Sequence, residues 1–444
     1  MRLCLAVIVC KLLRFIGKLV GKGSSLPGQY ALKLCPDVLG RVKLPPCVIA
    51  VTGSNGKTST VEMIAAILRA GGKTVVYNEE GSNQIEGVAT LILCSCTLSG
   101  RMRGDVLLLE SDERYARRSF RFFHPTHFVI TNLYRDQLTR NGHPEWVYDA
   151  ILPAIHQDTT LVLNADDPLV SCFARDHERV KWFGLDECSI STREHRGVYH
   201  DGARCPACGG RMEYAYYHYG HIGRYRCAEC GHCRHDTDFA VTALDLDGGR
   251  MTIDGETEIS LAFKSIYNVY NILAAWSVCA LAGADRGTMA AVINNYILKN
   301  GRMVRFTLGG HRGVLLTSKH ENSAAYDTNL AYIARREEPC QVLVIVDAIS
   351  RKYFTGETSW LWDIDFGQLN QAHVKKILLC GKYVHDLAMR FDYTGIPAEK
   401  IACYDAVVQA ADALAEDGGA EALYVVTCFS DRDKLLRLVK REEE

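Results

Sequence analysis

A glycine-rich turn between an apolar run and an amphipathic stretch is the feature that most constrains the fold of this chain. Residues 47–51 have the composition of a buried parallel strand, and Gly53, Asn55 and Gly56 follow closely. Apolar residues then recur at helical spacing over 61–68. In a strand, glycine turn and helix of this kind, backbone N–H groups and the helix N-terminus surround an anion. The segment therefore predicts a phosphate-binding loop and, with it, ATP binding.

The residues that follow the turn carry the expected side chains. Lys57 is placed to neutralise phosphate charge, Thr58 is placed to offer its hydroxyl to Mg²⁺, and Ser59 completes the loop. Val51 stands where the strict Walker pattern has glycine, so the loop is a shortened variant. A plain glycine-rich turn with a surface lysine is the disfavoured alternative.

Length and composition indicate a multidomain globular protein. A chain of 444 residues predicts two or three domains, and 48% hydrophobic with 23% charged residues is typical of a soluble protein. The net charge of −1 gives no reason to expect bulk nucleic-acid binding. The 18 cysteines are scattered, and no convincing secretion signal precedes them, which predicts a reducing, cytoplasmic location.

The N-terminal segment, residues 1–45, has an unusual composition. Residues 3–10 are almost wholly apolar but too few to span a bilayer, and no acidic residue precedes Asp37. The segment also lacks the small-residue cleavage site of a signal peptide. Residues 1–22 either lie on the inner face of an anionic membrane or pack on the following domain, and packing is the favoured alternative. The basic residues in question are Lys11, Arg14, Lys18 and Lys22.

The rest of the chain alternates short β-rich runs with helical patterns, which predicts an α/β fold with mostly parallel sheets. We expect a central ATP-binding domain over 46–300 and a smaller, Rossmann-like C-terminal domain over 301–444, with a hinge marked by Gly301-Arg302 and Gly309-Gly310. Ligands bind at the carboxyl ends of such strands. The expected strands are 48–51, 74–77, 105–110, 126–131, 160–164, 180–183, 342–346, 377–380 and 424–428, with a helix over 268–281.

A cysteine-rich stretch at about 200–236 interrupts this pattern and reads as an inserted module. Two Cys-x2-Cys pairs are each followed by glycine, so that two tight knuckles can point four thiolates at one tetrahedral centre. This spacing predicts a structural Zn²⁺ ribbon, with His232 and Cys233 as nearby competitors. The expected ligands are Cys205, Cys208, Cys227 and Cys230.

In this order, the motifs resemble those of the Mur ligase family, and within it the MurT-type synthetases, over nearly the whole chain. The four-cysteine insertion and Gln137, where amino-acid-adding Mur ligases tend to carry His, favour the MurT type. The motifs are Leu26-Pro27-Gly28, Leu34-Cys35-Pro36-Asp37, Thr52-Gly53-Ser54-Asn55-Gly56-Lys57-Thr58, Asn132-x-x-Arg135-Asp136-Gln137-Leu138-x-Arg140, Asn164-Ala165-Asp166-Asp167, Tyr267-Asn268-x-x-Asn271, Gly301-Arg302 and Ser359-Trp360-Leu361-Trp362-Asp363.

The resemblance implies roles and a reaction. Glu110 would complete the Mg²⁺ site, Asn271 would approach the adenine, and Arg302 would sit near the nucleotide. The implied reaction is ATP-dependent amidation of the α-carboxylate of D-glutamate in the lipid II stem peptide, through an acyl phosphate, to D-isoglutamine. The chain has no Gly-x-Cys-x-Gly nucleophile elbow to make ammonia. The resemblance therefore implies a separate, GatD-like glutaminase subunit.

The match weakens in the C-terminal domain. Where MurT-type chains carry an Asp-rich stretch with the proposed catalytic Asp, this chain keeps only Asp347 and Glu357 as carboxylates. Two interpretations stay open. Either one of these carboxylates replaces the catalytic Asp, or the chain is a divergent ligase with another acceptor or a non-catalytic ATP-binding subunit.

Overall fold

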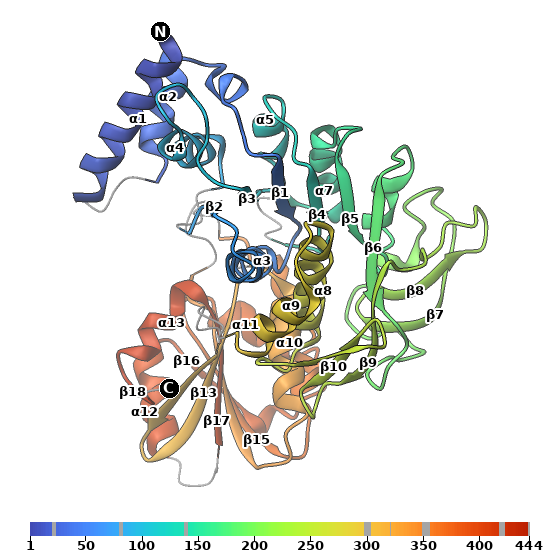
Figure 1. Cartoon of the computed structure of the whole chain (residues 1–444). Helices are drawn as coiled ribbons and strands as arrows, with labels where there is room; N and C mark the ends of the chain where they lie inside the picture. The colour runs from blue at the N-terminus through green and yellow to red at the C-terminus, as the bar shows by residue number, and fades with distance from the viewer. Residues whose placement is uncertain are drawn as a thin grey trace. The chain divides into compact units, whose positions relative to one another are not determined.

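The chain folds into two compact units, labelled by element in Figure 1. The computed structural model describes residues 1–19, 24–79, 83–136, 141–296, 303–319, 321–348, 356–416 and 422–442. Unit 1 comprises Met1–Tyr134, Pro144–His195 and Asp201–Leu298. Unit 2 comprises Arg135–His143, Arg196–His200 and Lys299–Glu444. The two short segments that join unit 2 were not expected from the sequence.

Unit 1 is built on a nine-stranded sheet in the order β11-β10-β9-β6-β5-β4-β1-β3-β2. Neighbouring strands pair in parallel throughout the part of the sheet ordered β9-β6-β5-β4-β1-β3-β2, and β10 and β11 add an antiparallel edge. All six strands expected in this region are present, within a few residues of their predicted ends. Their bounds are β1 Cys47–Thr52, β2 Val75–Tyr77, β3 Val106–Glu110, β4 His127–Ile130, β5 Thr160–Asn164, β6 Val180–Leu185, β9 Phe239–Asp245, β10 Arg250–Ile253 and β11 Thr257–Ser260.

Helices cover both faces of this sheet, as its doubly apolar strands require. Successive β1 residues point to opposite faces, so that Ile49 and Val51 join one core and Val48 and Ala50 join the other. The first core lies under α3 (Lys57–Ala70), α8 (Ile266–Leu281) and α9 (Arg286–Asn294). The second lies under α1 (Arg2–Leu19), α2 (Leu26–Leu34), α4 (Ile85–Ser95), α5 (Ala116–Phe120) and α7 (Pro144–Ile151).

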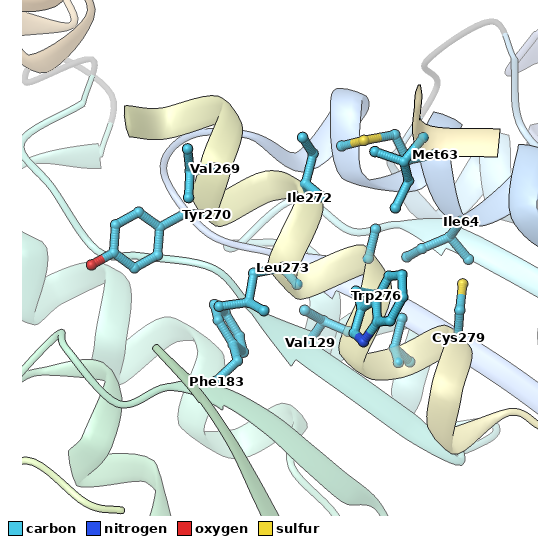
Figure 2. Close-up of a cluster of buried hydrophobic side chains, with 14 of the residues drawn as sticks. Met63, Ile64, Val129, Phe183, Val269, Tyr270, Ile272, Leu273, Trp276 and Cys279 are labelled. Carbon is cyan, nitrogen blue, oxygen red and sulfur yellow. The ribbon is translucent and has the colours of Figure 1, made fainter. Parts of the chain in front are cut away.

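Helix α8 is the central packing element of the first core. It is apolar nearly all round, which is typical of a helix buried on every side. Figure 2 shows Leu273 and Trp276 of this helix beside Val129 of β4, and Met63 of α3 belongs to the same core. Trp276 is almost fully buried, so truncation to alanine is expected to cost about 3–5 kcal/mol of stability.

The N-terminal residues belong to unit 1. One face of α1, with Ala6, Val7, Cys10 and Gly17, is buried, and the helix packs on α2 and α4. Among the helices in the described part of the chain, none combines the length and the apolar content needed to cross a bilayer.

The cysteine-rich insertion lies between β6 and β9. It forms a two-stranded antiparallel sheet of β7 (Met212–Tyr219) and β8 (Ile222–Cys227). Ile222, at the start of β8, joins the core beneath α8, so the hairpin is anchored to unit 1 by its tip.

Unit 2 has a seven-stranded sheet in the order β16-β15-β14-β17-β13-β12-β18, with helices on both faces. The five strands from β16 to β13 pair in parallel. The strands are β12 Met303–Leu308, β13 His311–Ser318, β14 Cys340–Ile345, β15 Val374–Cys380, β16 Ile401–Tyr404, β17 Ala422–Cys428 and β18 Lys440–Arg441. The helices are α10 Ser323–Ala334, α11 Val384–Phe391, α12 Val407–Glu416 and α13 Phe429–Leu436.

The expected hinge at Gly309-Gly310 is wrong. These glycines form the two-residue turn between β12 and β13, and β12 is paired antiparallel with β13 along the whole length of β12. Both have positive φ, 57° and 87°, as a tight hairpin turn requires. The other expected hinge residues, Gly301 and Arg302, lie outside the described residues.

Candidate functional site

The glycine-rich loop joins β1 to α3 at the carboxyl end of the sheet, where the sequence predicts a nucleotide. Gly53 and Gly56 have φ of 130° and 87°, a region that favours glycine. A Cβ on Gly53 would lie 2.3 Å from Thr131 Oγ1, and one on Gly56 would lie 1.9 Å from Asn271 Oδ1. Both positions therefore need glycine for backbone conformation and for space.

The turn after β4 holds the loop in place. Asn132 accepts a hydrogen bond from the backbone N–H of Asn55 at 2.8 Å, and Thr131 Oγ1 donates to the Asn55 carbonyl at 2.8 Å. Ser54 Oγ accepts from the backbone N–H of Tyr134 at 2.9 Å. In the sequence Asn132 appears only as the first residue of the motif that ends at Arg140, whereas in the structure this segment holds the phosphate loop through these hydrogen bonds.

Lys57 lies at the start of α3 and is almost buried. Its Nζ donates to the Gly53 carbonyl at 2.5 Å and pairs with the Glu113 carboxylate. The Glu113 side chain is 3% exposed, so this carboxylate depends on Lys57 for its compensating charge. Sequence reasoning did not select Glu113, although it lies in the acidic turn after β3.

Thr58 and Glu110 form a pair of oxygen donors next to the loop. Thr58 Oγ1 donates to Glu110 Oε2 at 3.0 Å, and the Thr58 side chain is exposed. A hydroxyl and a carboxylate beside a phosphate loop are the ligands that Mg²⁺ uses when it bridges protein and nucleotide. These residues therefore fit the predicted Mg²⁺ site.

The other predicted nucleotide residues are placed differently. Asn271, on α8, is buried with its carboxamide against Gly56, at the N-terminus of α3. Its approach to adenine stays a prediction. Ser59 is buried in the first turn of α3, and Arg302 lies outside the described residues.

Two buried aspartates that follow β5 support the segments around the phosphate loop. Asp167 accepts the backbone N–H of Leu133 at 2.9 Å and so fixes the turn after β4. Asp166 pairs with Arg234 at 2.5 Å and accepts from the Tyr270 hydroxyl at 2.7 Å. Both side chains are completely buried, so their role is to position the surrounding backbone.

The inserted hairpin reaches this support through its tip. His221 Nε2 lies 3.8 Å from Asp167 Oδ2, and Tyr219 contacts Tyr134 through the two hydroxyls. Burial lowers the pKa of His221, but the hydrogen bond and charge of Asp167 outweigh it, so that the net pKa is raised. The hairpin tip therefore contacts Asp167 and Tyr134, two residues of the segments that support the phosphate loop.

The other end of the hairpin carries the four predicted metal ligands. The sulfur atoms of Cys205, Cys208, Cys227 and Cys230 all lie within 4.8 Å of one another. The backbone N–H groups of Ala207 and Gly210 point at Sγ of Cys205 and Cys208, at 3.3 and 3.4 Å. Four sulfur donors with N–H support fit a closed tetrahedral Zn²⁺ site.

The two expected competitors are not part of this cluster. His232 Nε2 contacts the Pro168 carbonyl at 3.0 Å and Ser171 Oγ at 3.1 Å. Cys233 is exposed, and within the described residues the metal-ligand group consists of the four knuckle cysteines alone.

In unit 2, Asp347 lies just after β14, at the carboxyl end of the sheet. Its carboxylate accepts the backbone N–H of Lys382 at 2.7 Å and pairs with Lys434. The fully buried Asp431 accepts the backbone N–H of Asp347 at 2.9 Å and contacts Lys434 at 3.0 Å. Partial burial raises the pKa of Asp347. The hydrogen bonds from Lys434 and from the Lys382 N–H lower it by more, so that the net pKa lies below its ordinary value.

Glu357, the other predicted catalytic carboxylate, is exposed. It accepts the backbone N–H of Ser359 at 2.8 Å at the start of a short 3₁₀ helix, Ser359–Asp363, and this bond lowers its pKa. It is not drawn into the cluster around Asp347. Residues 349–355, between the two carboxylates, lie outside the described part of the chain.

The motif around Arg135 and Asp136 serves unit 2. Asp136 is buried, pairs with Lys319 at 2.5 Å and accepts from Asn322 at 2.8 Å. Arg135 pairs with Asp363 at 2.9 Å. Gln137, Leu138 and Arg140 of the same motif lie outside the described residues.

Comparisons with known proteins agree with this architecture. Residues 51–279 match the model of the Mur ligase middle domain, and residues 320–431 match that of the MurT ligase C-terminal domain. The chain is 32% identical to the MurT subunit of the glutamine-hydrolysing lipid II isoglutaminyl synthase of Streptococcus pneumoniae, over 87% of this chain and 86% of the relative.

Two further comparisons extend this. The MurT subunit of Staphylococcus aureus (strain N315) is 28% identical over 88% of this chain and 87% of the relative. Among solved structures, a type C pseudomurein peptide ligase from Methanothermus fervidus superposes with a TM-score of 0.68, at 21% identity over 88% of this chain and 78% of the other, which shows the shared fold.

Proposed function

Because this chain belongs to the Mur ligase family and carries a MurT-type C-terminal domain, we propose that it is the synthetase subunit of a lipid II isoglutaminyl synthase. The relatives that it matches over most of their length are named as that subunit. The observation that carries the proposal is the phosphate loop with Lys57 and the Thr58–Glu110 pair, which fits ATP and Mg²⁺.

The reaction is amidation of a carboxylate. The α-carboxylate of D-glutamate in the stem peptide of lipid II attacks the γ-phosphorus of ATP, and ADP leaves. Ammonia then attacks the acyl carbon, inorganic phosphate leaves, and D-isoglutamine results. A carboxylate is a poor electrophile until one of its oxygens becomes a phosphate leaving group, which explains the need for ATP.

The residues of unit 1 contribute charge and position. Bound ATP and Mg²⁺ supply the phosphoryl group and neutralise its charge. Lys57, with its ammonium beside the loop carbonyl of Gly53, stabilises charge on the transferring phosphoryl oxygens. Thr58 and Glu110 hold the ion, and Asn132 keeps the loop backbone in place. Glu113 pairs with Lys57 and so orients its ammonium.

For the catalytic carboxylate we assign Asp347 in preference to Glu357. Asp347 lies at the carboxyl end of a parallel sheet, where α/β proteins bind substrates, and Lys434 holds it in its ionised form. Ionised, it can orient the attacking ammonia and accept its proton. Glu357 instead lies on the surface and accepts the backbone N–H of Ser359.

Ammonia comes from a partner. We assign this role to a GatD-like glutaminase subunit, which the relatives' description as glutamine-hydrolysing supports. The substrate is lipid-linked, so we place the enzyme in the cytoplasm at the inner face of the membrane. The four-cysteine cluster holds Zn²⁺ for stability, since four thiolates leave no open coordination position.

The test is conversion of lipid II in the presence of the chain, a candidate glutaminase, ATP, Mg²⁺ and glutamine, with the product read by mass. A loss of about one dalton that depends on ATP and disappears in Lys57→Ala supports the proposal. The exposed Lys73→Ala serves as the matched control. ATP binding without conversion would favour another acceptor or a non-catalytic role, for which the altered carboxylates around Asp347 are the motivation.

A further inference from the structure

Helix α1 is apolar on two faces, and the described residues cover only one of them. The buried face packs on α2 and α4, as described above. The opposite face carries six large apolar side chains that are between 44% and 75% exposed. These are Leu5, Ile8, Leu12, Phe15, Ile16 and Leu19, here called the α1 stripe.

The α1 stripe is continuous. At 3.6 residues per turn its members fall within a sector of about 100° and run along a helix of roughly 27 Å. Scattered single apolar residues are normal on protein surfaces, but a stripe of this kind marks an interaction site. The neighbouring helix α2 adds a second exposed row, Leu26, Tyr30 and Leu34, spaced four residues apart.

Basic residues border the stripe. Lys18 lies beyond one edge of the 100° sector and Arg2 beyond the other, and both are exposed. Lys33 on α2 is also exposed. No acidic residue occurs before Asp37, which Arg41 already pairs. Within residues 1–36 the charged side chains beside the apolar surface are therefore all positive.

This pattern favours one occupant. An apolar stripe between cations is complementary to a bilayer surface, where acyl chains take up the apolar residues and anionic headgroups meet the lysines. A second copy of the same surface would bring like charges together. We propose that α1, with the adjoining row of α2, is an interfacial docking surface that holds unit 1 flat against an anionic phospholipid membrane.

The inference deepens the proposed function, because it rests on a lipid-linked substrate for its biological purpose. A protein held at the surface searches for lipid II in two dimensions. Docking as such is independent of catalysis, since none of the α1 stripe belongs to the nucleotide site.

The experiment is flotation of the full-length chain with vesicles. We expect it to bind vesicles of phosphatidylcholine with phosphatidylglycerol, to bind pure phosphatidylcholine much less, and to be released by salt. Ile16→Glu and Phe15→Glu should each weaken binding roughly tenfold or more. Val408→Glu, an equally exposed apolar residue of α12 (51% against 49% for Ile16), is the matched control. Lys18→Glu should weaken binding to the anionic vesicles only.

Further measurements separate the possible outcomes. Equal thermal unfolding of the variants and the native chain shows that α1 remains folded. Retained amidation of detergent-dispersed lipid II by Phe15→Glu, with loss on vesicle-embedded lipid II, supports docking. Absence of vesicle binding by the native chain overturns the inference even if amidation is intact. Loss of self-association or of glutaminase binding in Ile16→Glu, without vesicle binding, would assign the stripe to a protein contact. Vesicle binding without amidation would overturn only the proposed function.

Discussion

The two sheets of this protein present charge at their carboxyl ends in opposite ways. In unit 1 the glycine turn brings together the Lys57 ammonium, which pairs with Glu113, and the exposed hydroxyl of Thr58. In unit 2 the side chains satisfy one another, because Asp347 and Asp431 share Lys434 and take up neighbouring backbone N–H groups. The same architecture therefore builds an anion receptor in one unit and an anionic, internally compensated cluster in the other.

The largest effect is expected when the phosphate loop of unit 1 loses the Lys57 ammonium. Lys57→Ala should lower ATP-dependent turnover by about 10³-fold, because one preorganised charge on a transferring group accounts for roughly that factor. It also leaves the buried Glu113 without its partner, so thermal unfolding should be followed in parallel. Steady-state ADP release measures the first effect. Unchanged turnover would mean that this loop is not the nucleotide site.

Metal removal tests whether the stability of unit 1 depends on the cysteine cluster. We expect about one Zn²⁺ per chain, lost in Cys227→Ser and kept in Cys233→Ser. Hydrogen exchange read by mass should then rise around residues 200–236 and at the Asp167 turn, while β14, β15 and β17 of unit 2 keep their protection. If the metal-free protein kept native hydrogen-exchange protection and activity, the predicted structural role of Zn²⁺ would be contradicted.

The Asp347 cluster allows a matched pair of substitutions. Asp347→Asn should lower amidation roughly tenfold to a hundredfold, while ATP affinity changes little, because proton acceptance is lost and the shape is kept. Glu357→Gln, a neutral replacement of an exposed carboxylate, should change the rate less than about twofold. A larger effect for Glu357 would reverse our assignment of the catalytic carboxylate.

The smallest expected effect is the contribution of one carboxyl group of unit 2, that of Asp327, to the pH dependence of stability. Burial raises the pKa of Asp327 to about 7, and the backbone N–H of Asp365 offsets this only in part. A raised folded-state pKa stabilises the protein fully below the unfolded pKa, and this stability is lost as pH rises through the folded value. Between about pH 5 and pH 8 the native chain should therefore lose roughly 1–2 kcal/mol relative to Asp327→Asn, as urea unfolding would show. If the free energies of unfolding of the native chain and of Asp327→Asn changed in parallel with pH, this prediction would be contradicted.

Much of the fold was predictable because its signals are local. The strands of unit 1 are short apolar runs between polar turns, and the knuckle cysteines lie next to glycines that let the chain turn back. The hairpin at Gly309-Gly310 was misjudged because a glycine pair permits both a flexible joint and a tight turn, and the antiparallel partner decides which.

The parts of the site that the sequence did not reveal depend on contacts between distant residues. Glu113 meets Lys57 only because β1 and β3 are adjacent in the sheet. The pairing of Asp136 with Lys319 links positions 183 residues apart and leaves no periodic trace in the sequence. Asp431 fixes the backbone of Asp347, although 84 residues separate the two in the sequence.

The cysteine hairpin also bears on how the chain assembles. Parallel pairing of β9 with β6 must wait until residues 186–238 have been synthesised and folded back. The entropic penalty for closing such a loop grows with its length, and non-local pairing slows folding. An ion that joins Cys205 to Cys230 removes 25 residues from the effective loop. Metal binding at the four cysteines would therefore favour the return of β9 to β6, and with it the completion of the unit 1 sheet.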